Sequence, residues 1–284
     1  MKTKVGVIGL GALGRPVAER LIGAGFEVAV FDVQTEPLAA LKSAGAIACA
    51  SPADVAAHSE FIVSLVSDRA QTEDVVFGHN GIVKTLKAGS MLIIGSTLGP
   101  AAVKKVSEAI AAKGGETLDA PISGGLIAAR EGTLSLMIGG RQSAIDRALP
   151  VLHSFARAIT RAGEVGAGQA AKLAHQLVFS VNVIALLEGL SLGAAGGVAP
   201  SVMKAILTEG IANSTVLQLW KDLGPRWKRM LESTPPDVPP PNMRKDLHMV
   251  LEFAHELGVP LYIGTQASLT ADAGIATGHK DAQL

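Results

Sequence analysis

A glycine-rich turn near the N-terminus constrains the fold of this 284-residue sequence more than any other feature. The turn, Gly9-Leu10-Gly11-Ala12-Leu13-Gly14, follows the apolar run 5–8 and precedes a segment, 16–24, with helical spacing. In this strand–turn–helix context the glycine spacing predicts a dinucleotide-binding unit. We expect Gly9 to allow the tight turn, Gly11 to admit the pyrophosphate close to the backbone, and Gly14 to pack the helix against the strand. The first N–H groups of the helix would then face the phosphates.

An acidic residue at the end of the next apolar run, 27–31, bears on the choice of dinucleotide. Asp32 lies 18 residues after Gly14, close to the spacing at which a carboxylate binds the ribose hydroxyls. A carboxylate there repels a 2′-phosphate, and the following residues, 33–36, contain no arginine that could bind one. The sequence therefore favours NAD over NADP. The alternative is that Asp32 is an ordinary solvated carboxylate at a strand end.

Apolar runs alternate with helical patterns through the first half of the chain. After 27–31 these runs are 61–66, 91–94, 118–120 and 134–138. Runs of Val, Ile and Leu separated by helices predict buried, mostly parallel strands that are covered on both faces. Ser51 is expected to cap a helix that has Pro52 at its first position. We therefore expect an α/β fold built on a doubly wound, Rossmann-type sheet.

The pattern changes near residue 163. Helical spacing extends over 169–195, 201–208, 214–220, 243–257 and 261–273. We therefore expect a dinucleotide-binding Rossmann domain over 1–163 and an all-helical domain, for substrate binding and oligomerisation, over 164–284. The proline-rich run 234–241 cannot be the interior of a helix and predicts an extended loop. This loop is either a spacer between two helices or a rigid flap over the site.

Composition and charge exclude several other classes of protein. The sequence has 25 basic and 25 acidic residues, so its zero net charge indicates neither a nucleic acid nor an anionic membrane as partner. The single cysteine, Cys49, allows no internal disulfide and indicates no metal site. The longest apolar stretch, 177–187, is too short to span a bilayer and predicts a core helix. With no signal-peptide pattern at the N-terminus, we expect a cytoplasmic protein.

Four motifs together resemble the β-hydroxyacid dehydrogenase family, which includes 3-hydroxyisobutyrate dehydrogenase, tartronate semialdehyde reductase and, more distantly, 6-phosphogluconate dehydrogenase. They are Val7-Ile-Gly-Leu-Gly11, Asp119-Ala-Pro-Ile-Ser-Gly-Gly125, Gly168-Gln-Ala-Ala-Lys172 and Lys245-Asp-Leu247. The resemblance extends over almost the whole chain. It implies reversible hydride transfer between a nicotinamide dinucleotide and a short 3-hydroxy acid or its semialdehyde.

The resemblance assigns the general acid–base role to Lys172. Oxidation of an alcohol requires a group that takes the hydroxyl proton as the hydride leaves. An ordinary lysine pKa of about 10.4 is too high for this role, and burial or a nearby positive charge would lower it. The alternative is a solvent-facing lysine near a helix start. The same resemblance makes Ser123, Gly124 and Gly125 the anchor for a substrate carboxylate, through a hydroxyl and backbone N–H groups. Their alternative is an ordinary glycine turn.

The resemblance also assigns site roles to further residues, for which their own chemistry gives less support. Thr97, Leu65, Val66 and Lys245 match positions that contact the cofactor. His175 departs from the family, which has asparagine three residues after the lysine. Because positions i and i+3 share a helix face, we expect His175 to lie beside Lys172 and to replace asparagine as a ligand of the substrate hydroxyl. Unlike asparagine, it ionises near neutral pH. The alternative is a histidine that only packs in the helix.

Two other functions are compatible with the same scaffold. One is an imine reductase or broad aldehyde reductase, although the lysine argues against it. The other is a protein that senses a dinucleotide without turnover. The helical domain, rich in Ala, Gly and Leu, predicts an oligomer, and the resemblance implies a homodimer or homotetramer formed through this domain. The expected partner of the preferred enzyme is a small carboxylate substrate.

Overall fold

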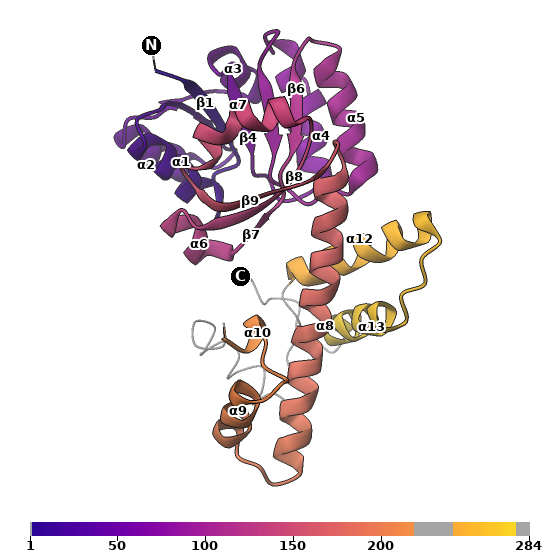
Figure 1. Ribbon diagram of the computed structural model, residues 1–284. Helices are drawn as coiled ribbons and strands as arrows, with labels where there is room; N and C mark the ends of the chain where they lie inside the picture. The colour runs from indigo at the N-terminus through magenta and orange to yellow at the C-terminus, as the bar shows by residue number, and fades with distance from the viewer. Residues whose placement is uncertain (1, 219–240, 277–284) are drawn as a thin grey trace. The chain divides into compact units, whose positions relative to one another are not determined.

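The computed structural model describes residues 2–218 and 241–276, and the chain forms two compact units, Met1–Lys172 and Leu173–Leu284. Helix α8, Ala167–Ala195, begins in the first unit and continues in the second (Figure 1). The sequence predicts the boundary between domains at 163/164, before this helix. The unit boundary lies within α8 because the first turn of the helix is hydrogen-bonded to the end of a strand in the first unit.

The first unit contains a sheet of nine strands whose order is β3-β2-β1-β4-β5-β6-β8-β7, with β9 paired to β8. Their bounds are β1 Lys4–Ile8, β2 Glu27–Phe31, β3 Ile47–Ala48, β4 Phe61–Ser64, β5 Met91–Ile94, β6 Glu116–Asp119, β7 Ile122–Ser123, β8 Leu134–Gly139 and β9 Ala156–Gly163. The strands from β3 to β6 are all parallel, whereas β8 is antiparallel to both β6 and β7. This mostly parallel sheet confirms the predicted fold class.

Alternating residues of the strands build two apolar layers, one on each face of the sheet. Val5 and Val7 of β1 belong to one layer, and Ile8 belongs to the other. Residues of α1, α2, α6 and α7 join the first layer, and those of α3, α4 and α5 join the second. The helices are α1 Gly14–Gly23, α2 Thr35–Ser43, α3 Pro52–His58, α4 Arg69–Phe77, α5 Pro100–Ala111, α6 Gly125–Glu131 and α7 Gln142–Leu152, with the 3₁₀ turn η1 Ile82–Lys84. Ser51 caps α3, as predicted, by accepting a hydrogen bond from the N–H of Asp54.

Three strands of the sheet, β3, β7 and β9, have no counterpart among the apolar runs of the sequence, and β9 is the longest of them. Strand β9 runs parallel to β8, yet most of its residues are exposed or only half-buried. Its sequence, Ala-Arg-Ala-Ile-Thr-Arg-Ala-Gly, lacks the apolar run by which the central strands were recognised. A strand that is paired by its backbone but exposed along its side chains gives no apolar periodicity.

The described part of the second unit is helical. Besides α8, its helices are α9 Pro200–Glu209, α10 Thr215–Gln218, α12 Pro241–Leu257 and α13 Tyr262–Ala276. A separate apolar cluster joins residues of α8, α10, α12 and α13, among them Leu187, Leu217, Leu247 and Ala271. Of the proline-rich run 234–241, Pro241 begins α12, and the predicted loop over 234–240 lies outside the described residues.

Helix α8 is longer than the apolar stretch recognised in the sequence. Among the described residues it is the one helix long and apolar enough to cross a membrane by length and composition, with a window of mean hydropathy 1.8 that is 28% buried. Core helices of soluble proteins have the same properties, so this finding assigns no membrane span.

The start of α8 is held by a buried carboxylate. Asp119, the last residue of β6, is fully buried, and its two oxygens accept hydrogen bonds from the N–H groups of Gly166 at 2.9 Å and Gln169 at 2.8 Å. Gly168 makes this approach possible, because a Cβ atom there would lie 2.5 Å from the carbonyl oxygen of Met137. Burial raises the pKa of Asp119 from its usual 3.8 to about 6, although backbone N–H groups of Gly166, Gln169 and Gly168 oppose the rise.

This raised pKa predicts a pH-dependent contribution to stability. Because the pKa of Asp119 is about 6 in the folded protein, folding favours its protonated form. The resulting stabilisation is complete below the ordinary pKa of 3.8 and is lost as the pH rises through about 6. Relative to Asp119→Asn, the wild-type protein should therefore gain free energy of unfolding, on the order of 3 kcal/mol at most, as the pH is lowered from 7 to 4.

Urea unfolding of both proteins across this range measures the difference. The control is Asp146→Asn, a change at an exposed position of α7, for which the difference from wild type should stay constant. A difference between wild type and Asp119→Asn that is flat, or that shrinks on acidification, would contradict the prediction.

Candidate functional site

The glycine turn has the geometry expected of a phosphate-binding turn. A Cβ atom on Gly14 would overlap the carbonyl oxygen of Gly9, so helix α1 can start this close to β1 only with glycine there. By contrast, a Cβ atom on Gly11 would meet no atom within 4 Å. Helix α1 begins at Gly14, and its N-cap residue, Leu13, makes no side-chain capping hydrogen bond. The open space at Gly11 and the uncapped helix start together fit a bound pyrophosphate.

Residues from neighbouring strands converge on this turn. Leu65 and Val66 follow β4, and the nearest atoms to a Cβ on Gly9 would belong to these two residues. Thr97 follows β5, which is the next strand of the sheet. The sheet order reverses between β1 and β4, where the chain leaves β1 first toward β2 and later returns to β4. Ligands of open parallel sheets bind beyond the carboxyl ends of the strands at such a switch point.

A pocket of about 670 Å³ lies beside the turn within the first unit. Its lining residues are Leu10, Gly11, Ala12, Arg15, Pro16, Glu19, Asp32, Gln34, Glu36, Pro37, Leu126 and Arg130. Asp32 is held at its edge, since its oxygens accept hydrogen bonds from the N–H groups of Leu10 at 2.5 Å and Gln34 at 2.8 Å. The position of Asp32 beside the glycine turn is the one that binding of a ribose requires.

The pocket contains two arginines that the sequence pattern at 33–36 does not predict. Arg15 directly follows the glycine turn, and Arg130 comes from α6, far away in the sequence. Arg15 forms ion pairs with Glu19 at 3.0 Å and Glu36 at 3.4 Å. Arg15 could have been noticed from its place in the first turn of α1, but no local pattern links Arg130 to the pocket.

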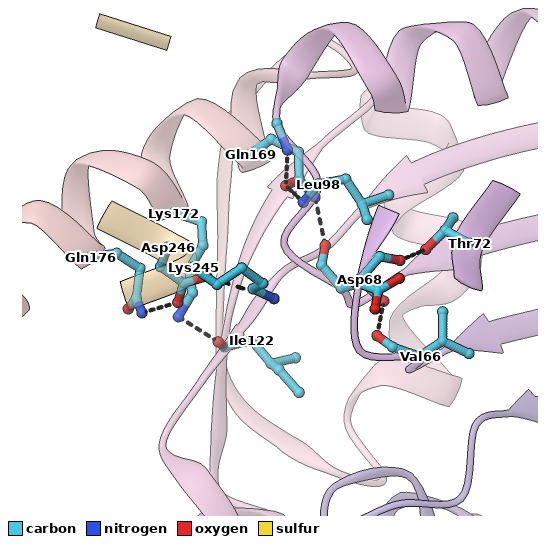
Figure 2. Close-up of polar contacts among 12 residues, drawn as sticks. Val66, Asp68, Thr72, Leu98, Ile122, Gln169, Lys172, Gln176, Lys245 and Asp246 are labelled. Carbon is cyan, nitrogen blue, oxygen red and sulfur yellow. Dashed lines mark hydrogen bonds and ion pairs between the residues drawn. The ribbon is translucent and has the colours of Figure 1, made fainter. Parts of the chain in front are cut away.

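The lysine and the serine-glycine turn are close together in the first unit. The side chain of Lys172 is buried, with 7% of its residue surface exposed, and its Nζ donates a hydrogen bond to the carbonyl oxygen of Ile122 at 2.9 Å (Figure 2). Ile122 directly precedes Ser123, Gly124 and Gly125, which join β7 to α6. A buried amine beside a hydroxyl and a glycine turn can exchange a proton with a small substrate that is held by the turn.

Two buried polar residues of this region, Asp119 and Gln169, belong to the sequence motifs, but the sequence alone assigns neither of them a role. Asp119 holds the start of α8, as described above, and Gln169 lies one turn before Lys172 and is fully buried. The side chain of Gln169 bonds to the backbone of Ser96, Leu98 and Gly99. Because these partners are about 70 residues away, sequence spacing could not have found them.

The remaining predicted residues, His175 and Lys245, belong to a chain of polar contacts in the second unit. The Oε1 atom of Gln176 lies 3.1 Å from Nδ1 of His175, and its Nε2 donates to Asp246 at 2.5 Å. Lys245 Nζ is 3.8 Å from the other oxygen of Asp246. Because an ionised carboxylate only accepts hydrogen bonds, the amide of Gln176 turns its NH₂ group to Asp246 and its oxygen to His175. We infer that Nδ1 of His175 carries the hydrogen, which makes Nε2 an acceptor in the neutral ring.

The structure therefore groups the predicted residues into two sets. The first unit brings together the glycine turn, Leu65, Val66, Asp32 and Thr97 along the strand ends, and also Lys172 with the turn at Ser123. The second unit contains Lys245 in α12 and His175 in α8. Lys172 and His175 lie one turn apart on α8, but Lys172 is buried and His175 is exposed.

Comparison with known proteins finds a matching family model for each half of the chain. A family model described as the NAD-binding domain of 6-phosphogluconate dehydrogenase matches residues 4–163. A second, described as NAD-binding of NADP-dependent 3-hydroxyisobutyrate dehydrogenase, matches residues 166–284. Together they account for the first unit and for the helical region that follows.

Individual relatives extend over nearly the whole chain. The 2-hydroxy-3-oxopropionate reductase of Escherichia coli is 34% identical over 260 residues, which cover 91% of this chain and 86% of that protein. The 2-(hydroxymethyl)glutarate dehydrogenase of Eubacterium barkeri is 32% identical, with coverage of 97% and 90%. A crystal structure of 3-hydroxyisobutyrate dehydrogenase from Salmonella typhimurium has a TM-score of 0.85 and 29% identity, and covers 98% of this chain and 96% of that one. The resemblance seen in the motifs is thus confirmed, and the chain belongs to the β-hydroxyacid dehydrogenase family of NAD(P)-dependent oxidoreductases.

Proposed function

We propose that this enzyme interconverts a short 3-hydroxy acid and its semialdehyde with NAD as cofactor and Lys172 as general acid–base. The observation that carries this proposal is the buried amine of Lys172, bonded to Ile122 O directly before the turn at Ser123. The names of the relatives support a small hydroxy or oxo acid as substrate, since they act on 2-hydroxy-3-oxopropionate and 2-(hydroxymethyl)glutarate. The proposed contacts of the substrate carboxylate are the hydroxyl of Ser123 and the N–H groups of Gly124 and Gly125.

The proton transfer assigned to Lys172 follows from its environment. When bound, the nicotinamide would supply the acceptor for the hydride that leaves the carbinol carbon in the oxidation. The hydroxyl proton passes to the neutral amine of Lys172 as the carbonyl forms. This transfer requires the neutral amine, because an ammonium has no lone pair that could take the proton. The hydrogen bond that the amine donates to Ile122 O places it directly before the turn at Ser123. In the reduction the ammonium returns the proton to the carbonyl oxygen.

The cofactor would lie along the carboxyl ends of β1, β4 and β5. The N–H groups at the start of α1 would bind the pyrophosphate, with Gly9, Leu10, Ala12 and Leu13 forming the rest of the turn. Leu65, Val66 and Thr97 are the proposed contacts from the neighbouring strand ends. Lys245, in the second unit, is the proposed contact near the nicotinamide and is bonded to Asp246.

The charges in the pocket support NAD rather than NADP. The pocket contains the carboxylates Asp32, Glu19 and Glu36 and the cations Arg15 and Arg130. Arg15 is paired with two of the carboxylates, which reduces its attraction for a 2′-phosphate. Asp32 is fixed by two backbone N–H groups and would bind the ribose hydroxyls.

We further propose that the enzyme is cytoplasmic and assembles as a homodimer or homotetramer through its helical region. Support for assembly comes from large apolar side chains that are exposed in the described part of the second unit. They are Val178, Leu192, Val202, Ile206, Ile211, Leu257, Val259, Tyr262, Ile263 and Leu269.

The general acid–base role of Lys172 is tested by replacing it with methionine, which has a similar apolar stem but no amine. Against a panel of 3-hydroxy acids, Lys172→Met should lower kcat/KM by about 10² to 10⁴-fold, because proton transfer loses its catalyst. Binding of NAD, measured by calorimetry, should be unchanged. Lys113→Met, at an exposed position, is the control and should behave as wild type. Full activity of Lys172→Met would remove the proposed mechanism, and a wild-type protein that binds NAD but turns over no hydroxy acid would favour a sensor.

The preference for NAD is tested at Asp32. Asp32→Asn removes the negative charge but retains an oxygen that can accept one of the two backbone hydrogen bonds. The ratio of kcat/KM with NAD to kcat/KM with NADP should fall by about tenfold or more, which corresponds to roughly 1.4 kcal/mol. The matched control is Glu27→Gln at the opposite end of the same strand, where the carboxylate pairs with Lys4. A wild-type enzyme that prefers NADP, or an unchanged ratio in Asp32→Asn, would refute the assignment.

The proposed role of His175 as ligand of the substrate hydroxyl predicts a pH effect. His175→Asn restores the family residue and removes an ionisable ring. The kcat/KM profile should therefore lose an inflection in the range of about pH 5 to 8, and the order of preferred substrates should change. His58→Asn, on α3, is the matched control. If the profile and the order of substrates are the same as in wild type, His175 only packs or bonds to Gln176.

A further inference from the structure

Gln169 is a buried side chain that neither the motifs nor the family comparison assigns. It is fully buried in the first turns of α8, one turn before Lys172. Its Oε1 accepts hydrogen bonds from the N–H groups of Leu98 at 2.8 Å and Gly99 at 3.2 Å, and its Nε2 donates to the carbonyl oxygen of Ser96 at 2.9 Å. The carboxamide is thus used as donor and as double acceptor, and Figure 2 shows its contact with Leu98. Through Ser96 and Leu98 it bonds to both neighbours of Thr97.

Further hydrogen bonds extend this set of contacts beyond Ser96. The hydroxyl of Ser96 donates to the carbonyl oxygen of Val66 at 2.6 Å, which ties the loop after β5 to the loop after β4. At the other end, the backbone N–H of Gln169 donates to Asp119 at the end of β6. A connected set of hydrogen bonds therefore crosses the carboxyl ends of β4, β5 and β6 and ends on the turn of helix that precedes Lys172. Buried networks in which every partner is satisfied make the local structure rigid.

We propose that Gln169 is a positioning residue, which holds the loop 95–99 and the helix turn bearing Lys172 at a constant spacing. This inference rests on the proposed function, because it assigns Thr97 to the cofactor side and Lys172 to proton transfer. Hydride and proton transfer require that cofactor, substrate and base be aligned, and a displacement of about 1 Å costs on the order of 10²-fold in rate. Gln169 joins the loop 95–99 to the helix turn that bears Lys172, and it therefore controls this alignment.

Neither methionine nor glutamate could replace Gln169 without loss of hydrogen bonds. Methionine has similar length but neither donates nor accepts strongly, so it would leave the N–H groups of Leu98 and Gly99 and the oxygen of Ser96 without this partner. Glutamate could still accept from Leu98 and Gly99 but could not, when ionised, donate to Ser96. Gln169→Met therefore removes all the side-chain hydrogen bonds of this link, whereas Gln169→Glu removes only the one to Ser96.

The test is a single-turnover measurement of hydride transfer with the hydroxy acid that the wild-type enzyme oxidises. A loss of folded protein reduces the amplitude of the nicotinamide signal but leaves its rate constant unchanged. A positioning role predicts that the rate constant itself falls, by about 10- to 100-fold in Gln169→Met and by less in Gln169→Glu. Gln142→Met is the control, because Gln142 is exposed on α7 and its side chain bonds to Asp146.

Amide hydrogen exchange without cofactor gives a readout that is independent of activity. Exchange of the Leu98 and Gly99 amides should be faster in Gln169→Met than in wild type, and should remain closer to wild type in Gln169→Glu. If Gln169→Met does not fold, the Gln169→Glu rate constant alone decides. Wild-type rate constants in the folded variants would overturn the positioning role while leaving the proposed function intact. Absence of turnover in the wild-type enzyme would defeat the proposed function and this assignment with it.

Discussion

The buried carboxylate of Asp119 is the interaction on which the arrangement of the site depends. Removing a carboxylate from water is costly unless hydrogen bonds compensate for it. Here the compensation comes from backbone N–H groups at Gly166 and Gln169, where the helix also provides partial positive charge. Because these bonds join the end of β6 to the start of α8, they decide where Lys172 lies, one turn later. The rise in the pKa of Asp119 to about 6 shows that desolvation is only partly offset.

The parallel sheet explains why residues so far apart in sequence are neighbours. The carboxyl ends of β1, β4, β5 and β6 lie at one edge, and the loops that leave them carry the glycine turn, Val66, Thr97 and Asp119. Gln169 and Ser96 link three of these loops. The sheet supplies the approximate arrangement, and the buried polar side chains refine it. This division suits a site that must hold a large cofactor and align a small substrate.

What could be predicted from the sequence follows from the range of each interaction. The central strands and the glycine turn are recognisable because buried parallel strands are apolar runs and because a local turn demands glycine. Strand β9 was missed because its pairing is a backbone property and its side chains are largely exposed. Asp32 was predicted from local spacing, whereas Arg130 and the partners of Gln169 depend on contacts between distant segments. Lys172 and Ser123 could be paired only through the resemblance to a family.

The pocket beside Asp32 illustrates why local sequence is a poor guide to cofactor preference. The absence of arginine from 33–36 argued for NAD, yet the fold brings Arg15 and Arg130 to the same pocket. Glu19 and Glu36 engage Arg15, so the charge that a 2′-phosphate would meet is a balance of several side chains. Such exposed ion pairs are individually weak, so a bound phosphate could still compete with Glu19 and Glu36 for Arg15. Asp32 is held by two backbone N–H groups, so its negative charge has a fixed place in this balance.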